Sequence, residues 1–571
     1  MGHHFLLVEG VNLYANIYDT DQLSVIRGSS FLYKDAVTHI KEQFEADLEA
    51  VSTGASSGLF CLKAQATQTI GEVAKKVAQK LRDHEDFRYL TFGVEHCEAA
   101  SLQQAKEQLW TQLRTHQLQK LTMQPDWSGN GDYQFGQASC DLAGTRIVAN
   151  HKQKIQGKDR NLSSSVCRRW NYGREKRHSY YHDLLTHDLQ EILKDYDFAE
   201  DINTLCADPN YPLEDGKPPE FDPEIPIMYP KLAGKMAVVY IDGNQFSDRQ
   251  REFMTHYTQN GKSLETEIKA QQRFDTTIQG LRNRFLQQVV KELVDEERST
   301  AINPLGHRRH NKQRKIFRLE TLLWGGDEML LVMPAWKGMD FLQRFFAFDW
   351  KLDGVEKPLT HAAGIVFCQA KTPIRIIQQL ARGLADRVKD GKDYGREHNA
   401  WDYLVLESID YPTTNDLGDY FKTRYPNGLS DNRSCGLPAI REWQETRKQL
   451  QTVLEERHLP RRKLYHVLQA LREHGITSGQ RTWQDLVRLK ADDLQTANLS
   501  AQEREEHRLY EVSEFQAWLK GEGNDDWPAL AKRCFGFGIN EPAKRAWAWI
   551  HAVELWDYLA PEPVTKPEVV S

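Results

Sequence analysis

Two short acidic stretches of the sequence have the residue types and spacing to do chemistry. In the first, an apolar run typical of a buried strand, residues 236–241, is followed by Asp242 and Gly243. In the second, two apolar runs flank Gly325-Gly326-Asp327-Glu328, as in a β-hairpin whose glycines adopt turn dihedrals closed to bulkier residues. A carboxylate at a strand end that faces carboxylates at a hairpin tip can hold divalent metal against a triphosphate. This arrangement predicts nucleotidyl transfer.

Nucleotidyl transfer depends on positioning and charge neutralisation more than on covalent catalysis. Two metal ions about 3.5–4 Å apart can activate a 3′-hydroxyl and stabilise the leaving pyrophosphate, and carboxylates hold them. We therefore predict Asp242, Asp327 and Glu328 as catalytic and metal-binding residues, with Mg²⁺ or Mn²⁺ as the cofactor. Each motif alone is commonly an ordinary turn or hairpin, so the functional interpretation depends on their joint occurrence in one unit.

The elements around these motifs predict an α/β (α+β) fold class in which one plan occurs twice. Residues 236–410 are expected to form a strand, helices, the Gly-rich hairpin, a strand, a helix over 373–389 and a last strand. A similar order is expected in the first hundred residues: strand 5–8, helix 31–51, strand 57–62, helix 72–82 and strand 89–94. The plan indicates an internal duplication.

The first of these two units lacks most of the acids of the second. Its hairpin, residues 53–58, has no acid at the tip, and only Glu9 corresponds to Asp242. One carboxylate cannot organise two metal ions. We therefore expect this unit to bind a nucleotide or to be purely structural.

The bulk properties predict a multidomain protein of the cytoplasm. The chain has 571 residues and a formal net charge of −7, and its eight cysteines show no disulfide-scaffold spacing. No apolar run approaches the length of a membrane span, and the first ten residues lack a signal-peptide layout. We expect reduced thiols and no membrane partner.

The order of the motifs resembles the large subunit of type III CRISPR effector complexes, of the Cmr-like kind, a polymerase family related to GGDEF-type cyclases. The family pattern is a strand ending Asp-Gly-Asp, a hairpin Gly-Gly-Asp-Asp, a strand with Ser/Ala-Gly-Ile, then Pro and a helix ending near Ala-Lys. The similarity covers nearly the whole chain. The matching residues are 241–244, 325–328, 363–366, Pro373 and 385–389 in the second unit, and 19–20 and 26–30 in the first.

The resemblance implies a domain organisation with two ferredoxin-like palm domains of the GGDEF/polymerase type. The implied regions are a degenerate first palm (1–100), a small middle domain with a linker (101–235), a catalytic second palm (236–430), an α-helical C-terminal domain (431–560) and a disordered tail (561–571). Nothing that could fold precedes Phe5, so the N-terminal HD nuclease domain of the family, and its DNA cleavage, are expected to be missing.

The resemblance also implies an activity, partners and nucleotide contacts. The implied activity is the synthesis of cyclic oligoadenylate messengers from ATP when a guide RNA-containing complex, with other CRISPR effector subunits, binds target RNA. The implied nucleotide-binding residues are Gly243, Asn244, Ser247, Gly325, Gly326 and Lys389.

Three positions depart from the family pattern. Asn244 stands where the family has a second Asp, and Ser247 stands where it usually has Gly. Glu328 replaces Asp, which keeps the charge but adds a methylene group. For Lys389 the structural alternative is a helix-end cation that interacts with the helix dipole.

Other segments carry weaker signals. Residues 140–144 occupy the place of a Cys-x-x-Cys-Gly half-site, but Ala143 removes one thiolate. The remaining candidates match no tetrahedral zinc spacing, so we expect a vestigial knuckle and no zinc; they are Cys140, Cys167, His151, His178 and His182. The basic run 307–318 can contact phosphate or RNA, or can be a solvated face. The segment 167–174 mixes cations with aromatics, and it can contact RNA or can be purely structural.

Other functions remain as alternatives. The protein can be a catalytically silent scaffold that organises guide RNA and partner subunits, or an adenylyltransferase that joins AMP to another acceptor such as S-adenosylmethionine. A stand-alone diguanylate cyclase is disfavoured by the two palms, the middle domain and the helical C-terminus.

Overall fold

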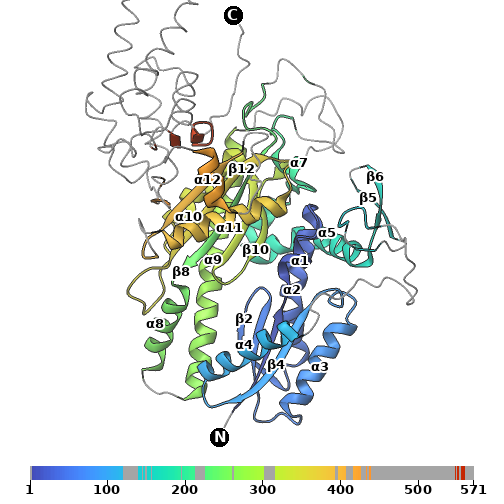
Figure 1. The fold of residues 1–571 in the computed structure, drawn as a ribbon, viewed down its shortest axis with the longest axis vertical. Coiled ribbons are helices and arrows are strands. Elements are labelled where there is room, and N and C mark those ends of the chain that lie inside the picture. The colour runs from blue at the N-terminus through green and yellow to red at the C-terminus, as the bar shows by residue number, and fades with distance from the viewer. Residues whose placement is uncertain are drawn as a thin grey trace, which may run out of the picture.

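The computed structural model describes about two thirds of the chain, in a mixed α/β arrangement as predicted (Figure 1). The described residues are 3–119, 139–147, 151–211, 221, 226–259, 263–300, 315–391, 396–406, 416–425, 433, 436–438 and 547–559, without positions 145, 156, 195, 548, 549, 552 and 553. Most of the predicted helical domain, the predicted tail and most of the basic run therefore lie outside the described residues.

The first sheet has four antiparallel strands in the order β2-β3-β1-β4. Its strands are β1 (His3–Gly10), β2 (Leu48–Thr53), β3 (Ser57–Leu62) and β4 (Phe92–Ala99). Its helices are α1 (Leu13–Ile17), α2 (Leu23–Gln43), α3 (Ile70–Asp83) and α4 (Leu102–Gln119). Because side chains alternate between the faces, Leu6 and Val8 pack towards α2 and α3, while Phe5 and Leu7 lie in a second cluster with residues of α4.

Two predicted elements of this unit were wrong in their bounds. The helix predicted over 31–51 begins at Leu23 and ends at Gln43, and Leu48–Thr53 is a strand because it pairs with β3 and buries Leu48 and Val51. The strand predicted over 89–94 begins only at Phe92, since Leu90 fills the core from a turn.

The second sheet repeats this order in its first four strands. Its order is β10-β11-β8-β12-β13-β14, and all neighbouring strands are antiparallel except β12 and β13, which are parallel. The strands are β8 (Lys235–Asn244), β10 (Glu320–Trp324), β11 (Glu328–Pro334), β12 (Thr360–Gln369), β13 (Ala400–Val405) and β14 (Leu437–Pro438). The helices are α8 (Phe246–Thr258), α9 (Leu264–Thr300), α10 (Ala335–Ala347), α11 (Ile374–Asp390) and α12 (Leu417–Arg424).

The long helix α9 joins the two units (Figure 1). Near its start, Ile268 lies in the cluster that covers one face of the first sheet. Further along, Phe285 contacts Phe341 and Phe345 of α10, beside the second sheet. Residues in the middle of α9 therefore lie at the junction between the two units.

Helix α5 (Ser164–Leu184) packs tightly across α2 of the first unit. A Cβ atom at Gly28 would lie 1.9 Å from the Arg169 carbonyl oxygen, and one at Gly173 would lie 1.9 Å from the Ser24 carbonyl oxygen. Only glycine permits this approach of the two backbones. The remaining elements are β5 (His151–Ile155), β6 (Lys158–Leu162), α6 (His187–Leu193), β7 (Tyr196–Phe198), α7 (Ile202–Cys206) and β9 (Lys315–Phe317).

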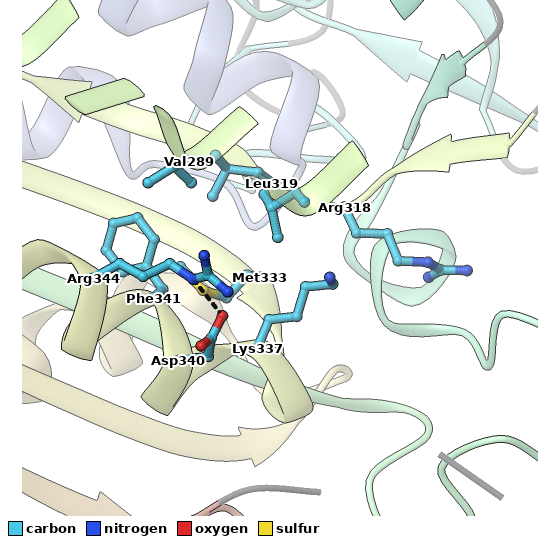
Figure 2. A pocket seen from close by; sticks show the side chains of 9 residues that line it. Val289, Arg318, Leu319, Met333, Lys337, Asp340, Phe341 and Arg344 are labelled. Carbon is cyan, nitrogen blue, oxygen red and sulfur yellow. Dashed lines mark hydrogen bonds and ion pairs between the residues drawn. The ribbon is translucent and has the colours of Figure 1, made fainter. Parts of the chain in front are cut away.

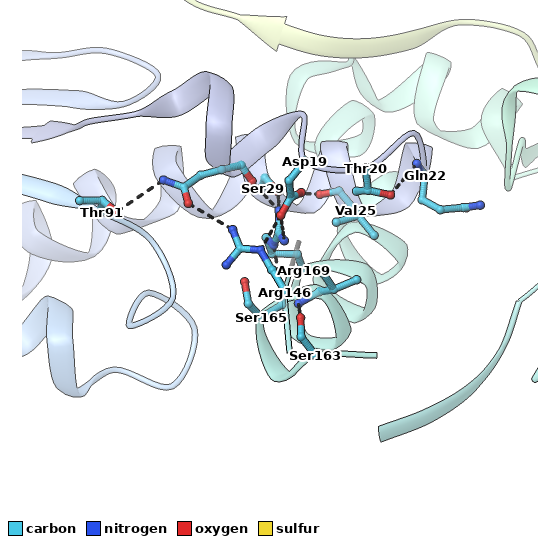
Figure 3. Close-up of polar contacts among 12 residues, drawn as sticks. Asp19, Thr20, Gln22, Val25, Ser29, Thr91, Arg146, Ser163, Ser165 and Arg169 are labelled. Atoms are coloured by element: carbon cyan, nitrogen blue, oxygen red, sulfur yellow. Dashed lines mark hydrogen bonds and ion pairs between the residues drawn. The ribbon is translucent and has the colours of Figure 1, made fainter. Parts of the chain in front are cut away.

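A buried ionic network fixes this helix crossing (Figure 3). Arg169 of α5 is 1% exposed and donates to both carboxylate oxygens of Asp19, at 2.9 and 2.7 Å. Arg146 donates to the same carboxylate at 2.5 Å, and together the two guanidinium groups hold the pKa of Asp19 below its usual value against the effect of burial. In the segment 167–174, Arg169 and Gly173 are therefore structural.

A second buried ion pair links the first unit to the second sheet. Arg27 of α2 donates to both carboxylate oxygens of Glu320 in β10, each at 2.5 Å, and the two side chains are 2% and 5% exposed. One continuous apolar cluster also contains core residues of both sheets, such as Leu6 and Val239. Within the described part of the chain, no helix has the length and apolarity needed to cross a membrane.

Candidate active site

The two acidic motifs meet at one edge of the second sheet. Asp242 lies near the C-terminal end of the buried central strand β8 and pairs in register with Glu328 of β11. The Gly243 amide donates to the Asp327 carbonyl (3.1 Å), and the Gly325 amide donates to the Glu328 carbonyl (2.9 Å), which closes the hairpin. A Cβ atom at Gly243 would lie 2.9 Å from that of Asp327, so this approach favours glycine. The structure thus brings together the residues that the sequence placed 85 positions apart.

The carboxylates of this edge interact electrostatically. Burial raises the pKa of Asp327, and the negative charges of Asp242 and Glu328 raise it further. Lys389 acts in the opposite direction. The site therefore concentrates negative charge that a cation can neutralise.

Lys389, from the last turn of α11, is the cation that lies in the site. Its Nζ is 2.5 Å from Asp242 Oδ2 and donates to the Gly243 carbonyl at 2.9 Å. Both side chains of the pair are largely buried. The ammonium group is therefore placed between two oxygens that the sequence assigns to metal or nucleotide.

Two other predicted nucleotide-binding residues lie where β8 leads into α8. Asn244 is 2% exposed, its amide donates to the His398 carbonyl (3.1 Å), and its Oδ1 is buried without a hydrogen-bond partner. Ser247 is exposed in the first turn of α8, after Gln245, whose φ of 49° makes the sharp turn from the strand. Gly326 is exposed at the hairpin tip.

Glu328 is turned towards α11. Its Oε1 lies 3.7 Å from the Arg382 guanidinium, which in turn lies over the Tyr240 ring, 5.8 Å from its centroid. Tyr18, which caps the C-terminus of α1 in the first unit, is also close: burial raises its pKa, and the charge of Glu328 raises it further. The first unit therefore reaches the acidic edge of the second.

The sequence did not identify His361, which pairs in register with Gly243. Burial and, to a smaller extent, the charge of Lys389 lower the pKa of His361 to about 3, so its imidazole is neutral at physiological pH. Its backbone amide donates to Asn399 Oδ1 (2.7 Å), and its ring packs against Phe345 and Trp350. His361 therefore supports the site structurally, through its strand pairing with Gly243.

The donor atoms of the site suit a hard divalent cation. Asp242, Asp327, the Gly243 carbonyl and the unpartnered Asn244 Oδ1 are all oxygen donors, which Mg²⁺ and Mn²⁺ prefer. With Glu328 beside Arg382, no group of three or more His, Cys, Asp or Glu side chains that could hold a metal ion forms among the described residues. The residues present therefore fit such a cation, provided that the cation replaces the Lys389 ammonium group as the partner of Asp242.

The cysteines of the predicted zinc knuckle lie in an apolar environment. Cys140 and Cys167 are buried in one cluster with Val25 and Trp170. Amide groups of Gln153 and Asn171 donate to the Cys167 sulfur, both at 3.7 Å. Of the predicted histidine ligands, His151 contacts Ser164, His178 packs on Phe198, and His182 lies near Asp183.

The first sheet contains the same backbone arrangement without the acids. The Gly10 amide donates to the Ser56 carbonyl and the Gly54 amide to the Ser57 carbonyl, both at 2.7 Å, as the corresponding groups do in the second sheet. Glu9 pairs in register with Ser57 as Asp242 pairs with Glu328. Ser56 and Ser57 thus occupy the places of Asp327 and Glu328.

This chain is similar to several proteins of known structure. Neither a protein-family model nor a curated protein sequence matches it. One of the similar solved structures is an apo Csm1-Csm4 cassette, with 12% sequence identity, a TM-score of 0.44 and an alignment that covers 98% of this chain and 70% of that chain. A second is a type III-B Cmr-beta complex in the apo state, with 10% identity, a TM-score of 0.45 and coverage of 97% of this chain and 82% of that chain. A third is Csm1 of T. onnurineus, with 13% identity, a TM-score of 0.46 and coverage of 98% of this chain and 70% of that chain. These similar structures contain large subunits of type III CRISPR complexes, the family that the motifs of this chain resemble.

Proposed function

We propose that this chain is a metal-dependent nucleotidyltransferase that makes cyclic oligoadenylate from ATP, as the large subunit of a type III CRISPR complex. The observation that carries the proposal is the convergence of Asp242, Asp327 and Lys389 at one sheet edge. Phosphoryl transfer depends on positioning and on electrostatic stabilisation, which two carboxylates that can hold metal and a cationic side chain beside them can provide.

In the proposed reaction, the oxygen of a 3′-hydroxyl attacks the α-phosphorus of ATP. A phosphorus–oxygen bond forms, the bond to the β-phosphate oxygen breaks, pyrophosphate leaves and the hydroxyl proton passes to water. Mg²⁺ or Mn²⁺, when bound, neutralises phosphate charge and favours the ionised hydroxyl. Asp242 and Asp327 would hold the cation, and Glu328 would add negative charge beside them. Lys389 would exchange Asp242 for a phosphate oxygen.

The remaining nucleotide contacts follow from the hairpin and the β8–α8 turn. Gly325 and Gly326 have no side chains that would keep a nucleotide from the hairpin backbone, and Ser247 offers an exposed hydroxyl. Asn244 would act through its unpartnered Oδ1. The two sheets would be ferredoxin-like palms, the first of them degenerate, and the complex would hold guide RNA, partner subunits and target RNA in the cytoplasm.

The test uses the full chain, alone and assembled with partner subunits, guide RNA and target RNA. Structures of Csm1-Csm4 cassettes with cA4, cA3 and AMPPNP make ATP the first nucleotide to try. Mass spectrometry of products should show oligoadenylate that depends on Mg²⁺ or Mn²⁺ and disappears in Asp327→Asn. Asp353→Asn, at an exposed loop residue, is the matched control and should leave product unchanged. An assembled complex that yields no product from ATP, from GTP, or from ATP with S-adenosylmethionine would refute the proposal.

A silent scaffold is the second candidate, and one contact favours it. The Lys389–Asp242 pair leaves the key carboxylate neutralised without any metal. A scaffold predicts that Asp242→Ala and Asp327→Ala leave immunity intact in cells, whereas the enzyme predicts its loss. Product that carries AMP on S-adenosylmethionine would instead identify the adenylyltransferase.

A further inference from the structure

The hairpin formed by β5 and β6 carries an excess of exposed positive charge. Its two strands contain one acid, Asp159, and four cations, which are Lys152, Lys154, Lys158 and Arg160. The three lysines are exposed, and the arginine is partly exposed. Because the whole chain has a formal net charge of −7, this excess is a local property of the hairpin.

The hairpin cations lack the acidic partners that cations elsewhere in the protein have. Three cations of the neighbouring helix α5 are paired with acids: Arg168 with Asp86, Arg169 with Asp19 and Lys176 with Asp35. In the pocket between α9 and α10, Arg344 donates to Asp340 at 2.7 Å (Figure 2). In contrast, no carboxylate of the residues that the structure describes lies within ion-pair distance of any of the four hairpin cations.

Two acids lie on or beside the hairpin, and neither forms an ion pair with its cations among the described residues. Asp159 stands opposite Lys154 in the antiparallel pairing. The Asp141 carboxylate accepts a hydrogen bond from the Asn161 backbone amide at 2.7 Å. The four cations therefore outnumber the acids around them two to one.

The hairpin is held firmly at its base and presents one face to solvent. Among the described strands, β5 and β6 pair only with each other, and they lie to one side of both sheets (Figure 1). Ile155 and Leu162 are buried in one cluster with Trp170 of α5. Because side chains alternate along a strand, Lys152 and Lys154 share the opposite face, about 6.6 Å apart along the chain.

The composition of the hairpin identifies the chemistry of its partner. Protein interfaces have an apolar core, but the two apolar side chains of these strands, Ile155 and Leu162, are 6% and 0% exposed. Neither strand has an aromatic side chain on which a base could stack. Exposed, unpaired lysines in a row are complementary to a row of phosphates, and their binding releases the counterions of the polyanion.

We propose that the β5–β6 hairpin binds the phosphate backbone of an RNA strand through Lys152, Lys154 and Lys158, without reading its bases. The choice of RNA rests on the proposed function, in which the chain belongs to a complex that holds guide RNA and target RNA. The hairpin is separate from the acidic edge, so RNA binding and nucleotide turnover can be measured independently.

The first experiment measures the binding of a fluorescently labelled single-stranded RNA to the full chain at several salt concentrations. Each phosphate contact contributes about 0.7 to the slope of log affinity against log salt concentration. The double variant Lys152→Gln, Lys154→Gln should therefore lower this slope by about 1.4 and weaken binding roughly tenfold at low salt. An unchanged slope, or the absence of RNA binding by wild type, would overturn the proposal.

The matched control removes the same charge from another exposed surface. Lys75 and Lys76 are exposed on α3, close to Glu72. The double variant Lys75→Gln, Lys76→Gln should keep the wild-type slope and affinity. An equal loss in both double variants would show a general effect of net charge and overturn the proposal. Since all four lysines are exposed, both variants should melt at the wild-type temperature.

Two further measurements test the backbone contact against other roles of the lysines. The hairpin variant should weaken binding to an adenosine-rich and to a uridine-rich RNA by the same factor, and a loss confined to one sequence would overturn the proposal. Lysines also keep exposed strand edges from pairing with other chains. A hairpin variant that self-associates in light scattering but binds RNA as wild type does would show this role instead and overturn the proposal.

Product assays distinguish failure of this inference from failure of the proposed function. RNA binding that depends on the hairpin lysines, in a complex that makes no product, would support the inference and refute the proposed function. Product formation together with RNA binding that does not depend on these lysines would do the reverse. Loss of a partner subunit from the variant complex, with unchanged RNA affinity, would identify an acidic protein as the partner and overturn the inference.

Discussion

Replacing Lys389 with methionine removes a positive charge from between two oxygens that a divalent cation would also use. In the free chain, the ammonium group pairs with Asp242 at 2.5 Å and donates to the Gly243 carbonyl at 2.9 Å, and the paired side chains are 14% and 13% exposed. A cation that binds Asp242 must first displace this ammonium group. The variant has no such competitor, so metal binding and catalysis should change in opposite directions.

The magnitudes follow from these contacts. A hydrogen bond to a charged group contributes about 1.5–3 kcal/mol, and about 1.4 kcal/mol is a tenfold change in affinity. Lys389→Met should therefore bind Mn²⁺ roughly 10- to 100-fold more tightly than wild type. Product formation should fall by about 10²–10³, the usual effect of losing one donor that stabilises charge in the transition state.

Titration of the full chain with Mn²⁺, followed by electron paramagnetic resonance of the free ion, measures the first effect. Mass-spectrometric product assays at saturating Mn²⁺ measure the second. Lys371→Met is the matched control, because Lys371 is exposed just before α11. Equal or weaker Mn²⁺ binding by Lys389→Met would show that the lysine does not compete with the cation, and an unchanged product yield would show that it does not bind phosphate.

Two further predictions concern the first unit. Burial raises the pKa of Glu9 from 4.5 to about 7, so the ionised form destabilises the fold, by up to about 3 kcal/mol, and stability falls as pH rises from 4.5 to about 7. Glu9→Gln should raise the melting temperature above pH 7 but not below pH 4.5, and a gain independent of pH would contradict this. Gly28→Ala should lower the melting temperature strongly, because its Cβ would lie 1.9 Å from the Arg169 carbonyl oxygen. Gly280→Ala, whose Cβ would meet nothing nearer than 3.8 Å, should be neutral or slightly stabilising, and similar losses in both would contradict the helix-crossing argument.

The acidic edge was predictable because its determinants are local. The apolar run 236–241 forms a strand buried on both faces. Gly243 and Gly325 permit the strand and the hairpin to approach closely, and their backbone amide hydrogen bonds hold Asp327 at the strand end. Register then follows, since Asp242 and Glu328 are cross-strand partners. Short-range rules of turn chemistry and strand alternation are sufficient for such a geometry.

Other parts were not predictable from local pattern. The strand Leu48–Thr53 continues a helical pattern in sequence, and only its pairing with β3 makes it a strand. Arg27 and Glu320 are 293 positions apart and meet only because α2 packs against β10.

The loss of acids from the first unit raises the question of what maintains its close fit to the second. Glu9 alone remains at its strand end, with Ser56 and Ser57 in place of two carboxylates. Yet Arg27 of this unit is anchored to Glu320 of β10 by a buried ion pair, and one apolar cluster contains core residues of both sheets. Removal of either partner of that pair would leave an uncompensated buried charge, which is strongly destabilising. The close fit between the two units is therefore maintained by this anchor and by the shared core, and it does not depend on the acids that the first unit lacks.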